Sequence, residues 1–451
     1  MRHLIFLLAL PFWFLSSKQA LGQTTLWDTL PFKLNQSPRT FLEDKQTDKL
    51  WIAGNFFIID GAREHGVMIY DGQNYELPFQ GQKFVKTPVT SFMYHDEVYI
   101  GGFLGLVKVV DTQLVWIDTT AVVYGATYDQ ARDRMLIYGQ FSQFGGVSTA
   151  GVAVWDGQTV SGFYGIDSLI DGGDQIFDVE IYKDQFYVGG NINRNTLLQE
   201  FMRWDGSKWT DVGGGIPTAS FGAVADLQIY QGDLYVAGNF ATSTGAPGDA
   251  IARWDGNQWH EVGGGIGPGI DGGALVREMM IYKDELWVIG VFDLVGGLPI
   301  SQIVRWDGES WCGIGTNIEG GLSTMGLYRD TLYIGGKIWS MDGDSSFSDV
   351  AQLLDPTYAD TCTEAQTTVS IREKPSQDIR IYPTPGSDQL SFAYPKELRI
   401  QKIEVMDAKG QYIVSQPMLS TIYTASWPRG IYLVKIYFNN HRTWTDKWIK
   451  Y

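Results

Sequence analysis

The sequence has few charged side chains, and cations are the scarcer kind. Charged residues make up 19% of the 451 positions, whereas an average globular chain has about 25%. Only 34 Lys and Arg stand against 51 Asp and Glu, which gives a formal net charge of −17 at pH 7. Phosphates repel such an acidic chain, so nucleic acid and anionic membrane surfaces are excluded as main partners.

Residues that usually carry out catalysis or bind metals are also scarce. The chain has five His and two Cys, and no His or Cys cluster has the spacing of a zinc site. A Gly-x-Ser-x-Gly motif, a phosphate-binding loop and a dinucleotide-binding motif are all missing. The sequence therefore predicts no metal site and no cofactor. Whether the protein is an enzyme stays open, with a non-enzymatic protein favoured.

Long apolar runs are missing except at the start of the chain. Residues 4–15 form one apolar stretch of 12, preceded by Arg2 and His3, whereas a membrane-spanning helix needs about 20 residues. Ala20-Leu21-Gly22 fits a cleavage site, so residues 1–22 are predicted to be a signal peptide; an uncleaved anchor is the alternative. Export permits a disulfide, and we predict that Cys312 pairs with Cys362; two free thiols are the alternative.

Glycine and aromatic residues are abundant, and many of them follow a repeat. Seven segments share an aliphatic-aromatic pattern that leads into one or two glycines, and successive segments start on average 47 residues apart. They span residues 50–56, 98–103, 135–141, 186–192, 234–240, 286–292 and 332–338. Strand-forming repeats of about 40–50 residues indicate propeller blades. The sequence predicts an all-β fold, with a seven-bladed β-propeller over residues 23–355.

Each repeat is interpreted as four strands joined by tight turns. Asp, or Gly in one unit, stands two positions before each shared segment, where it suits a turn. A later Trp-Asp-Gly or Tyr-Asp-Gly predicts a hairpin into the fourth strand. The aromatic residue that follows is predicted to pack between blades; a stacking platform for sugars is the alternative. The seventh unit lacks this hairpin, and residues 25–30 are predicted to supply its fourth strand, leaving no exposed edge.

These repeats resemble those of Kelch and galactose-oxidase-type propellers. The resemblance rests on the Gly-Gly of the second strand and on the later Trp, and it covers roughly residues 24–360. It implies the propeller fold. It implies little about function, because propellers carry many unrelated activities. The copper ligands of galactose oxidase have no counterparts in this chain.

A linker and a second β module follow the repeats. Residues 356–377 are rich in Thr and contain Glu373-Lys374-Pro375, which predicts a linker. Alternating strands from 378 to 451 predict a small C-terminal β-sandwich. Residues 24–377 carry a net charge of −23, while residues 378–451 carry +4. Solubility outside the cell explains the acidic part; attraction of Ca²⁺ or a cationic partner is the alternative.

The tail carries a set of motifs in a fixed order. They are formed by Tyr382, Pro383, Pro385, Asp388, Asp407, Gly410, Gly430, Tyr432 and Lys447. With these motifs the tail resembles the type A C-terminal sorting domain of the type IX secretion system of Bacteroidetes. Thr384 and Trp427 depart from the usual Asn and Leu without changing the motif spacing. The resemblance implies export to the cell surface or beyond, with the secretion machinery as a partner; an ordinary adhesive sandwich is the alternative.

Acidic clusters on the long loops are the candidate ligand site. Strand parity places loops between second and third strands on the same face as the inter-blade connections, and we call this the long-loop face. The candidates are Asp167, Asp171, Asp174, Asp271, Asp342 and Asp344, and Ca²⁺ stays open as a ligand there.

The function predicted from the sequence is binding of an extracellular glycan or protein through the long-loop face. The alternatives are a carbohydrate-active lyase or hydrolase that uses loop carboxylates, and a structural surface component.

Overall fold

A computed structural model describes residues 26–450 apart from short gaps. The gaps are 57, 60–61, 64–65, 80–86, 112, 193–199, 217–221, 241–248, 268–273, 358–361, 364–379, 383–388, 394–398, 408–411, 417–420, 429 and 439–442. The chain divides into two compact units, Met1–Gln366 and Thr367–Tyr451, here called the N-terminal and C-terminal units. The predicted signal peptide lies outside the described residues.

The N-terminal unit contains seven four-stranded antiparallel sheets, numbered here in order of their first strands. Sheet 1 contains β2 (Pro38–Asp44), β3 (Lys49–Gly54), β6 (Val67–Tyr70) and β7 (Tyr75–Glu76), and sheet 2 contains β8 (Pro88–Tyr94), β9 (Glu97–Gly102), β10 (Gly105–Val110) and β11 (Gln113–Asp118). Sheet 3 contains β12 (Val122–Asp129), β13 (Arg134–Gln140), β16 (Val152–Trp155) and β17 (Val160–Gly162). Sheet 4 contains β18 (Gln175–Tyr182), β19 (Gln185–Asn191), β20 (Phe201–Trp204) and β21 (Trp209–Asp211).

Sheets 5 to 7 follow the same plan, except that sheet 7 takes its fourth strand from the start of the chain. Sheet 5 contains β22 (Ala223–Tyr230), β23 (Asp233–Asn239), β24 (Ile251–Trp254) and β25 (Trp259–His260). Sheet 6 contains β27 (Leu275–Tyr282), β28 (Glu285–Val291), β30 (Ile303–Trp306) and β31 (Trp311–Gly313). Sheet 7 contains β32 (Ile318–Tyr328), β33 (Thr331–Met341), β34 (Val350–Leu353) and β1 (Trp27–Asp28).

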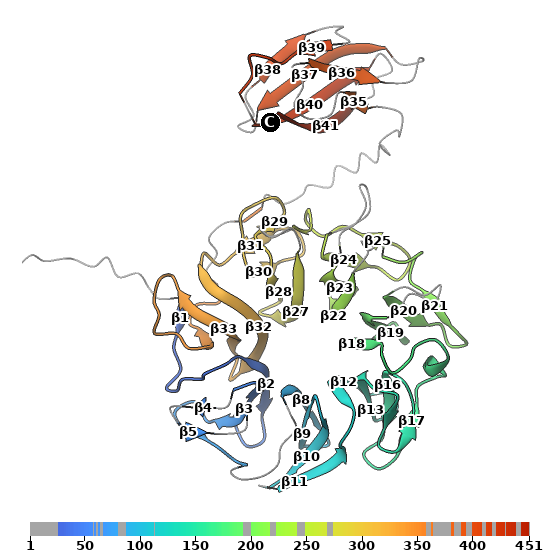
Figure 1. The fold of residues 1–451 in the computed structure, drawn as a ribbon, viewed down its shortest axis with the longest axis vertical. Helices are drawn as coiled ribbons and strands as arrows, with labels where there is room; N and C mark the ends of the chain where they lie inside the picture. The colour runs from blue at the N-terminus through green and yellow to red at the C-terminus, as the bar shows by residue number, and fades with distance from the viewer. Residues whose placement is uncertain are drawn as a thin grey trace, which may run out of the picture. The chain divides into compact units, whose positions relative to one another are not determined.

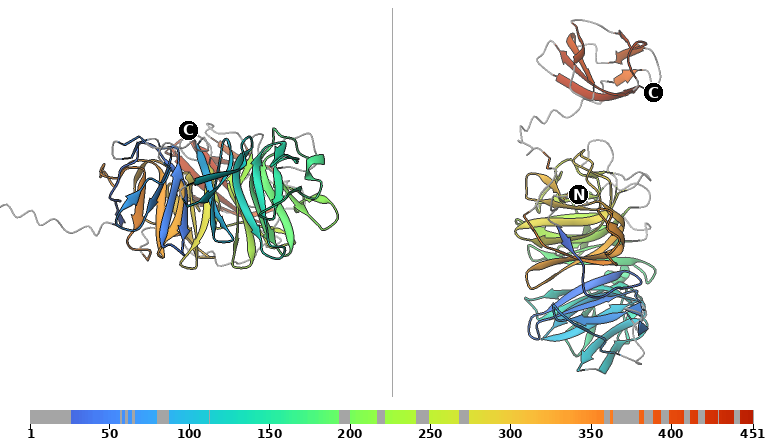
Figure 2. Two further views of the ribbon diagram at one scale, coloured as in Figure 1. Left: turned by 90° about the horizontal axis from the view of Figure 1, so that it is seen from below. Right: turned by 90° about the vertical axis from the view of Figure 1, so that its left-hand side faces the viewer.

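The seven sheets are arranged in a ring, with their first strands on the inner side (Figure 1). Each first strand contacts the first strand of the next sheet, and β32 of sheet 7 contacts β2 of sheet 1. The strands run across the thickness of the ring (Figure 2). In sheet 7, Trp27 of β1 pairs with Leu353 of β34. The N-terminal segment thus supplies the missing strand of the seventh unit.

The turns and bulges explain why the repeat contains Asp and Gly where it does. The predicted turn residues Asp48, Asp96, Asp133, Asp184, Gly232, Asp284 and Asp330 have φ between 47° and 86°, the left-handed region that Asp and Gly tolerate best. All seven first strands contain a bulge near their start, including β2 and β8, which begin with proline. A bulge bends a strand and re-aims its side chains.

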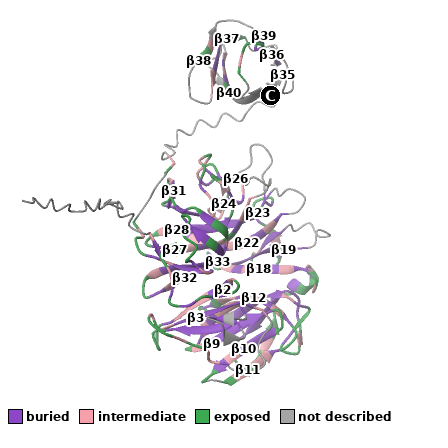
Figure 3. Cartoon of the chain, turned by 60° about the vertical axis from the view of Figure 1, so that its left-hand side comes forward, coloured by how far each residue is buried: buried purple, intermediate pink, exposed green. Residues whose placement is uncertain are grey.

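Aromatic side chains fill the spaces between sheets. Trp259 of sheet 5 donates its indole N–H to the Val212 carbonyl at 3.0 Å, and Trp311 of sheet 6 donates to the Val262 carbonyl at 3.2 Å. Val212 and Val262 each follow the last strand of the preceding sheet, and both are buried. Buried residues concentrate in the strands and exposed ones in the loops (Figure 3). The packing role predicted for these rings is thus what their contacts show.

The loops of the N-terminal unit contain several short elements. They are the hairpins β4 (Ile58–Ile59) with β5 (Ala62–Arg63) and β14 (Gln143–Phe144) with β15 (Val147–Ser148), the pair β26 (Ile266–Gly267) with β29 (Leu294–Val295), and the 3₁₀ helix η1 (Ile166–Ser168). In the part of the chain that the structure describes, no helix is long and apolar enough to cross a membrane.

The C-terminal unit contains two antiparallel sheets with one apolar core between them. The strands are β35 (Arg380–Tyr382), β36 (Gln389–Ala393) and β39 (Thr421–Tyr423) in one sheet, and β38 (Tyr412–Gln416), β37 (Ile400–Asp407), β40 (Gly430–Phe438) and β41 (Thr443–Lys450) in the other. Leu390, Ile403, Val405, Val434 and Ile436 are fully or almost fully buried in that core.

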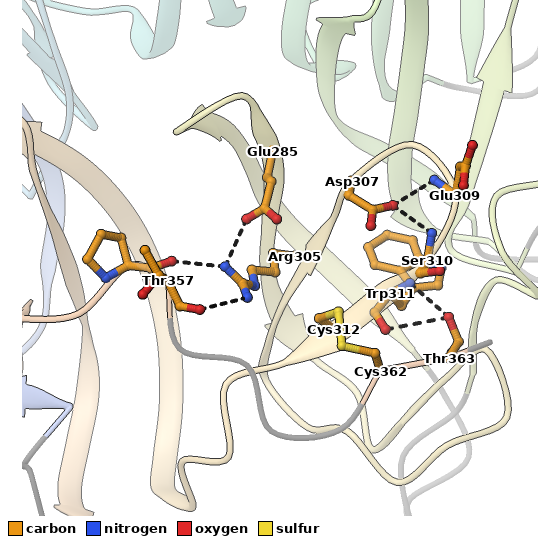
Figure 4. Close-up of a disulfide and its surroundings, with 11 residues drawn as sticks. Glu285, Arg305, Asp307, Glu309, Ser310, Trp311, Cys312, Thr357, Cys362 and Thr363 are labelled. Carbon is orange, nitrogen blue, oxygen red and sulfur yellow. Dashed lines mark hydrogen bonds and ion pairs between the residues drawn. A yellow bond between two sulfur atoms is a disulfide. The ribbon is translucent and has the colours of Figure 1, made fainter. Parts of the chain in front are cut away.

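The predicted disulfide is present. Cys312 of β31 bonds to Cys362, 50 residues later in the sequence, beyond the last strand of sheet 7 (Figure 4). The segment runs antiparallel to β31 at this point, and Thr363 donates its backbone N–H to the Trp311 carbonyl at 2.8 Å. The bridge therefore fastens the end of the N-terminal unit to sheet 6.

Candidate functional site

A pocket opens on the long-loop face where sheet 7 meets sheet 1. Its volume is about 740 Å³. Its walls come from the segment before β2, from the end of β3, from the end of β33 and from the loop before β34. The residues used below are Asn35, Arg39, Asn55, Lys337, Trp339 and Asp349. Pockets of this size accommodate small-molecule ligands.

Trp339 is the most unusual side chain of the pocket, because it is a large aromatic residue with 58% of its surface exposed. It sits in an extended hairpin, since β32 and β33 each have 11 residues, whereas the corresponding strands of the other sheets have six to eight. Glu319 pairs with Ser340 and Gly320 pairs with Ile338, so Trp339 has no partner across the strands. Lys337 and Trp339 are both exposed while Ile338 between them is buried, so the indole lies on the same outward face of β33 as the Lys337 side chain.

The hairpin that presents Trp339 is held firmly against sheet 1. Ser323 of β32 donates its hydroxyl to the Pro38 carbonyl of β2 at 2.9 Å. A Cβ on Gly335 would lie 2.4 Å from the Pro38 side chain, and one on Gly320 would lie 1.7 Å from the Lys337 carbonyl. Both positions thus require glycine. The Ser323 hydrogen bond and the Gly335–Pro38 contact therefore hold the hairpin against sheet 1, while Gly320 lets the two strands of the hairpin approach each other closely.

Three cations lie at or near this pocket. Arg39 and Lys337 line it, and the Lys337 ammonium lies 5.1 Å from the centre of the Trp339 ring. The third is Arg277 of β27, whose pKa is lowered mainly by burial and also by the charge of Arg39. Asp349 also lines the pocket, but its carboxylate accepts the Ile338 N–H at 3.1 Å, and burial raises its pKa to about 6.

The first group of predicted site residues lies between sheets 3 and 4. Asp167 is exposed in η1. Asp174 is buried, and its carboxylate accepts the Asp171 N–H at 2.8 Å, while the Asp171 carboxylate accepts the Gly173 N–H at 2.7 Å. Two of the three carboxylates thus hold a turn together. Asp271, the next predicted residue, lies outside the described residues.

The second group lies in the loop before β34. The Asp342 carboxylate accepts the Asn317 N–H and the Asp344 carboxylate accepts the Ser346 N–H, both at 2.8 Å. Among the residues that the structure describes, no group of three or more His, Cys, Asp or Glu could hold a metal ion. Ligand binding by the six predicted aspartates remains a prediction, while the observed contacts of Asp171, Asp174, Asp342 and Asp344 are those of turn residues.

A row of carboxyl groups along the inner wall of the ring was missed by the sequence analysis. Asp178 accepts the Leu227 N–H at 2.8 Å, Asp226 accepts the Met279 N–H at 2.5 Å, and Glu278 accepts the Met325 N–H at 3.1 Å. Each carboxyl therefore links its own sheet to the next one, from sheet 4 to sheet 7. The sequence signal is that all three stand eight residues before the shared second-strand segment.

Burial raises the pKa of these carboxyls. The pKa of Glu278 rises to about 8, and that of Asp226 is raised well above its usual range, with the charges of Asp178 and Glu278 adding to the effect. The nearby Glu180 reaches about 7, again mainly through burial. A carboxylate pair could serve a glycosidase, but here the carboxyl oxygens are engaged by backbone N–H groups of the neighbouring sheet, which is a structural role.

The Glu278 carboxyl makes stability depend on pH. Its pKa lies near 4.5 in the unfolded chain and at about 8 in the folded protein, so the folded protein binds the extra proton and loses stability as pH rises from 4.5 to 8. We expect Glu278→Gln, which keeps the acceptor for Met325, to be at least about 1 kcal/mol more stable than the parent at pH 8, since one pKa unit is about 1.4 kcal/mol. The two proteins should unfold alike at pH 4.5, as measured by urea unfolding.

The exposed Glu309 provides the matched control. Glu309→Gln makes the same chemical change on the surface, and its stability difference from the parent should stay within about 0.5 kcal/mol at both pH values. A Glu278→Gln protein that gains no stability relative to the parent between pH 4.5 and 8 would show that Glu278 is ionised in the folded state.

Comparison with known families identifies the C-terminal unit. Residues 380–451 match the family described as the secretion system C-terminal sorting domain. No curated protein sequence is significantly similar to the chain.

The sorting-motif residues lie partly in described strands: Tyr382 ends β35, Asp407 ends β37, Gly430 and Tyr432 lie in the first three residues of β40, and Lys447 lies in β41. Pro383, Pro385, Asp388 and Gly410 lie outside the described residues.

Two of the solved structures similar to the chain come from Bacteroides thetaiotaomicron. One is the extracellular domain of BT4673, described as a one component system; it is 12% identical, with a TM-score of 0.50, and the match covers 94% of this chain and 52% of that one. A second structure of BT4673, described as a hybrid two component system, has the same identity and TM-score with 59% of its chain covered. This chain thus spans little more than half the length of these structures, and the likeness concerns the fold alone.

Proposed function

We propose that the N-terminal unit is a seven-bladed β-propeller of Kelch-like type, occupying residues 23–355 after removal of a signal peptide at 1–22. Seven consecutive four-stranded sheets in a ring support this assignment. The contact of β32 with β2 and the pairing of β1 with β34 join the two ends of that ring. Residues 356–377 then form the linker to the sorting domain at 378–451.

The sorting domain indicates secretion through the type IX system, and we propose display at the outer-membrane surface or release. Deleting residues 378–451 should leave the protein in the periplasm, because the machinery would have nothing to recognise. Cell fractionation with protease shaving of intact cells measures this. A matched test fuses residues 367–451 to an unrelated periplasmic protein, which should then reach the surface. Surface display of the truncated protein would contradict the assignment.

We propose that the propeller binds an extracellular glycan on its long-loop face. The observation that carries this proposal is the exposed Trp339 at the edge of a pocket of about 740 Å³. Sugar rings stack their C–H faces on exposed indoles, and amides such as those of Asn35 and Asn55 suit hydroxyl groups. A protein ligand at the same face is the alternative that the sequence left open.

A glycan array with the mature protein tests the proposal. Trp339→Ala should lose the signals that the parent protein gives, because the stacking surface is removed. Tyr128→Ala is the matched control, since Tyr128 is 46% exposed at the end of β12, where the short turns lie. If Trp339→Ala and the parent give the same signals, the proposed site is wrong.

The same array distinguishes binding from catalysis. A lyase or hydrolase that uses loop carboxylates would shorten the glycans it binds, and Asp342→Asn with Asp344→Asn would stop that. A binding protein leaves the bound glycans intact. Mass spectrometry of the recovered glycans decides between the two.

A further inference from the structure

The cations around the pocket lack the partners that other cations of this chain have. Arg253, Arg305 and Arg329 each form an ion pair with a carboxylate at 3.0 Å or less. Within the described part of the chain, Arg39 and Arg277 form no ion pair or hydrogen bond, and the Lys337 ammonium contacts only the Trp339 ring. Carboxylates that could pair with them are abundant in this chain, which has 51 Asp and Glu against 34 Lys and Arg.

Like charges gathered without a counterion raise the free energy of the folded protein unless an anion binds among them. Arg277 lies near enough to Arg39 for this repulsion to act, since burial and then the charge of Arg39 lower the pKa of Arg277. Among the residues that line the pocket, Asp349 is the acidic side chain: it is only 8% exposed, its carboxylate accepts the Ile338 N–H, and burial raises its pKa while the charge of Lys337 has the opposite effect. The lining cations Arg39 and Lys337 outnumber this single carboxyl. The site is thus a local basic region on an acidic protein.

We infer that the pocket binds an acidic saccharide, with one sugar ring on Trp339 and its carboxylate or sulfate group between Arg39 and Lys337. This inference rests on the proposed glycan-binding function and specifies its ligand class. An aromatic platform alone would suit a neutral glycan, and cations alone would suit any anion; their combination at one rigid seam favours a charged sugar. Guanidinium groups match carboxylate and sulfate oxygens through paired N–H donors.

The test measures binding of five probes to the mature full chain by calorimetry. Four are a galacturonate oligomer, its methyl ester, sulfated dextran and plain dextran, and the fifth is polyglutamate as an acidic peptide. At least one acidic probe should bind at least about tenfold more tightly than its neutral partner, a difference of about 1.4 kcal/mol. Because exposed charges are screened by salt, that preference should shrink between 0.05 M and 0.5 M NaCl.

Single substitutions assign the preference to the pocket. Arg39→Gln and Lys337→Gln should each weaken the acidic probe about tenfold and leave its neutral partner unchanged. Lys208→Gln is the matched control, because exposed Lys208 lies in the turn between β20 and β21 on the opposite face. Its effect should stay within about twofold.

The outcomes separate the two proposals. If neutral probes bind equally well and only Trp339→Ala weakens them, the acidic class is wrong while glycan binding stands. If no probe binds, the acidic class is wrong, and the glycan array then decides the general function. If polyglutamate binds as tightly as the acidic sugars and Trp339→Ala has no effect on it, the site recognises acidic peptides and the inference is overturned. An equal loss in Lys208→Gln would also overturn it.

Discussion

Replacing Trp27 with Ala should lower the free energy of unfolding by about 3–5 kcal/mol, the usual cost of removing a buried tryptophan. Trp27 is 3% exposed and belongs to the apolar core shared by sheets 6 and 7. Its indole N–H donates to the Thr316 hydroxyl at 3.0 Å. The substitution would therefore leave a cavity and remove one hydrogen bond of the buried Thr316 hydroxyl, which would keep its bond to the Ile314 carbonyl at 3.4 Å. It would also weaken a strand of only two residues.

Urea unfolding of the mature protein measures this loss, and Trp339→Ala is the control. Both variants remove an indole, but Trp339 is 58% exposed, so its removal should cost less than about 1 kcal/mol. If Trp27→Ala loses no more stability than Trp339→Ala, β1 does not contribute to closing sheet 7. The deficit of Trp27→Ala should appear mainly in the unfolding rate if the N-terminal strand docks late in folding.

The features that the sequence predicted are those controlled by local residue order. All seven predicted second-strand segments fall on β3, β9, β13, β19, β23, β28 and β33. A short continuous run of aliphatic and aromatic residues between a left-handed turn and a glycine has few other conformations available. The role of residues 25–30 could be predicted because the seventh repeat lacked its fourth strand, while residues 25–30 formed a strand-like segment outside any repeat.

The pocket could not be predicted in the same way, because its walls meet only after the ring has closed. Arg39 and Lys337 are almost 300 residues apart in the sequence. The exposure of Trp339 depends on which face of β33 it lies on, and a shift of one residue in a strand moves a side chain to the other face. One local signal was present: after the shared segment ends at residue 338, residues 339–341 continue the strand pattern, whereas the other units enter a loop at this point.

The predicted acidic site shows why loop carboxylates are ambiguous in a sequence. Asp accepts backbone N–H groups in turns as readily as it binds cations. In the Asp171 and Asp344 turns the structure shows the first of these roles. By contrast, Asp226 and Glu278 lie within strands, where an acidic residue is uncommon, and that position was the stronger sign of a specific role.

Removing the disulfide should cost about 4 kcal/mol, the loop-closure entropy of a bridge over about 50 residues. The Cys312→Ala/Cys362→Ala protein would keep the Thr363-Trp311 hydrogen bonds and the bond from Arg305 to the Pro356 carbonyl at 2.9 Å (Figure 4). These contacts alone are weak, because each must order a segment that the bridge no longer holds. We expect the residues after β34 to become sensitive to protease before the ring unfolds.

Urea unfolding with and without reductant tests the contribution of the bridge. The parent protein should lose stability when reduced and approach the double variant, and the double variant should not respond to reductant. Thr363→Val is the control, because it removes the side-chain hydrogen bond to the Trp311 N–H at 2.8 Å while leaving both cysteines; it should cost only about 1 kcal/mol. A double variant as stable as the parent would mean that sheet 6 and the end of the N-terminal unit are held by packing alone, and that the cysteines serve another purpose.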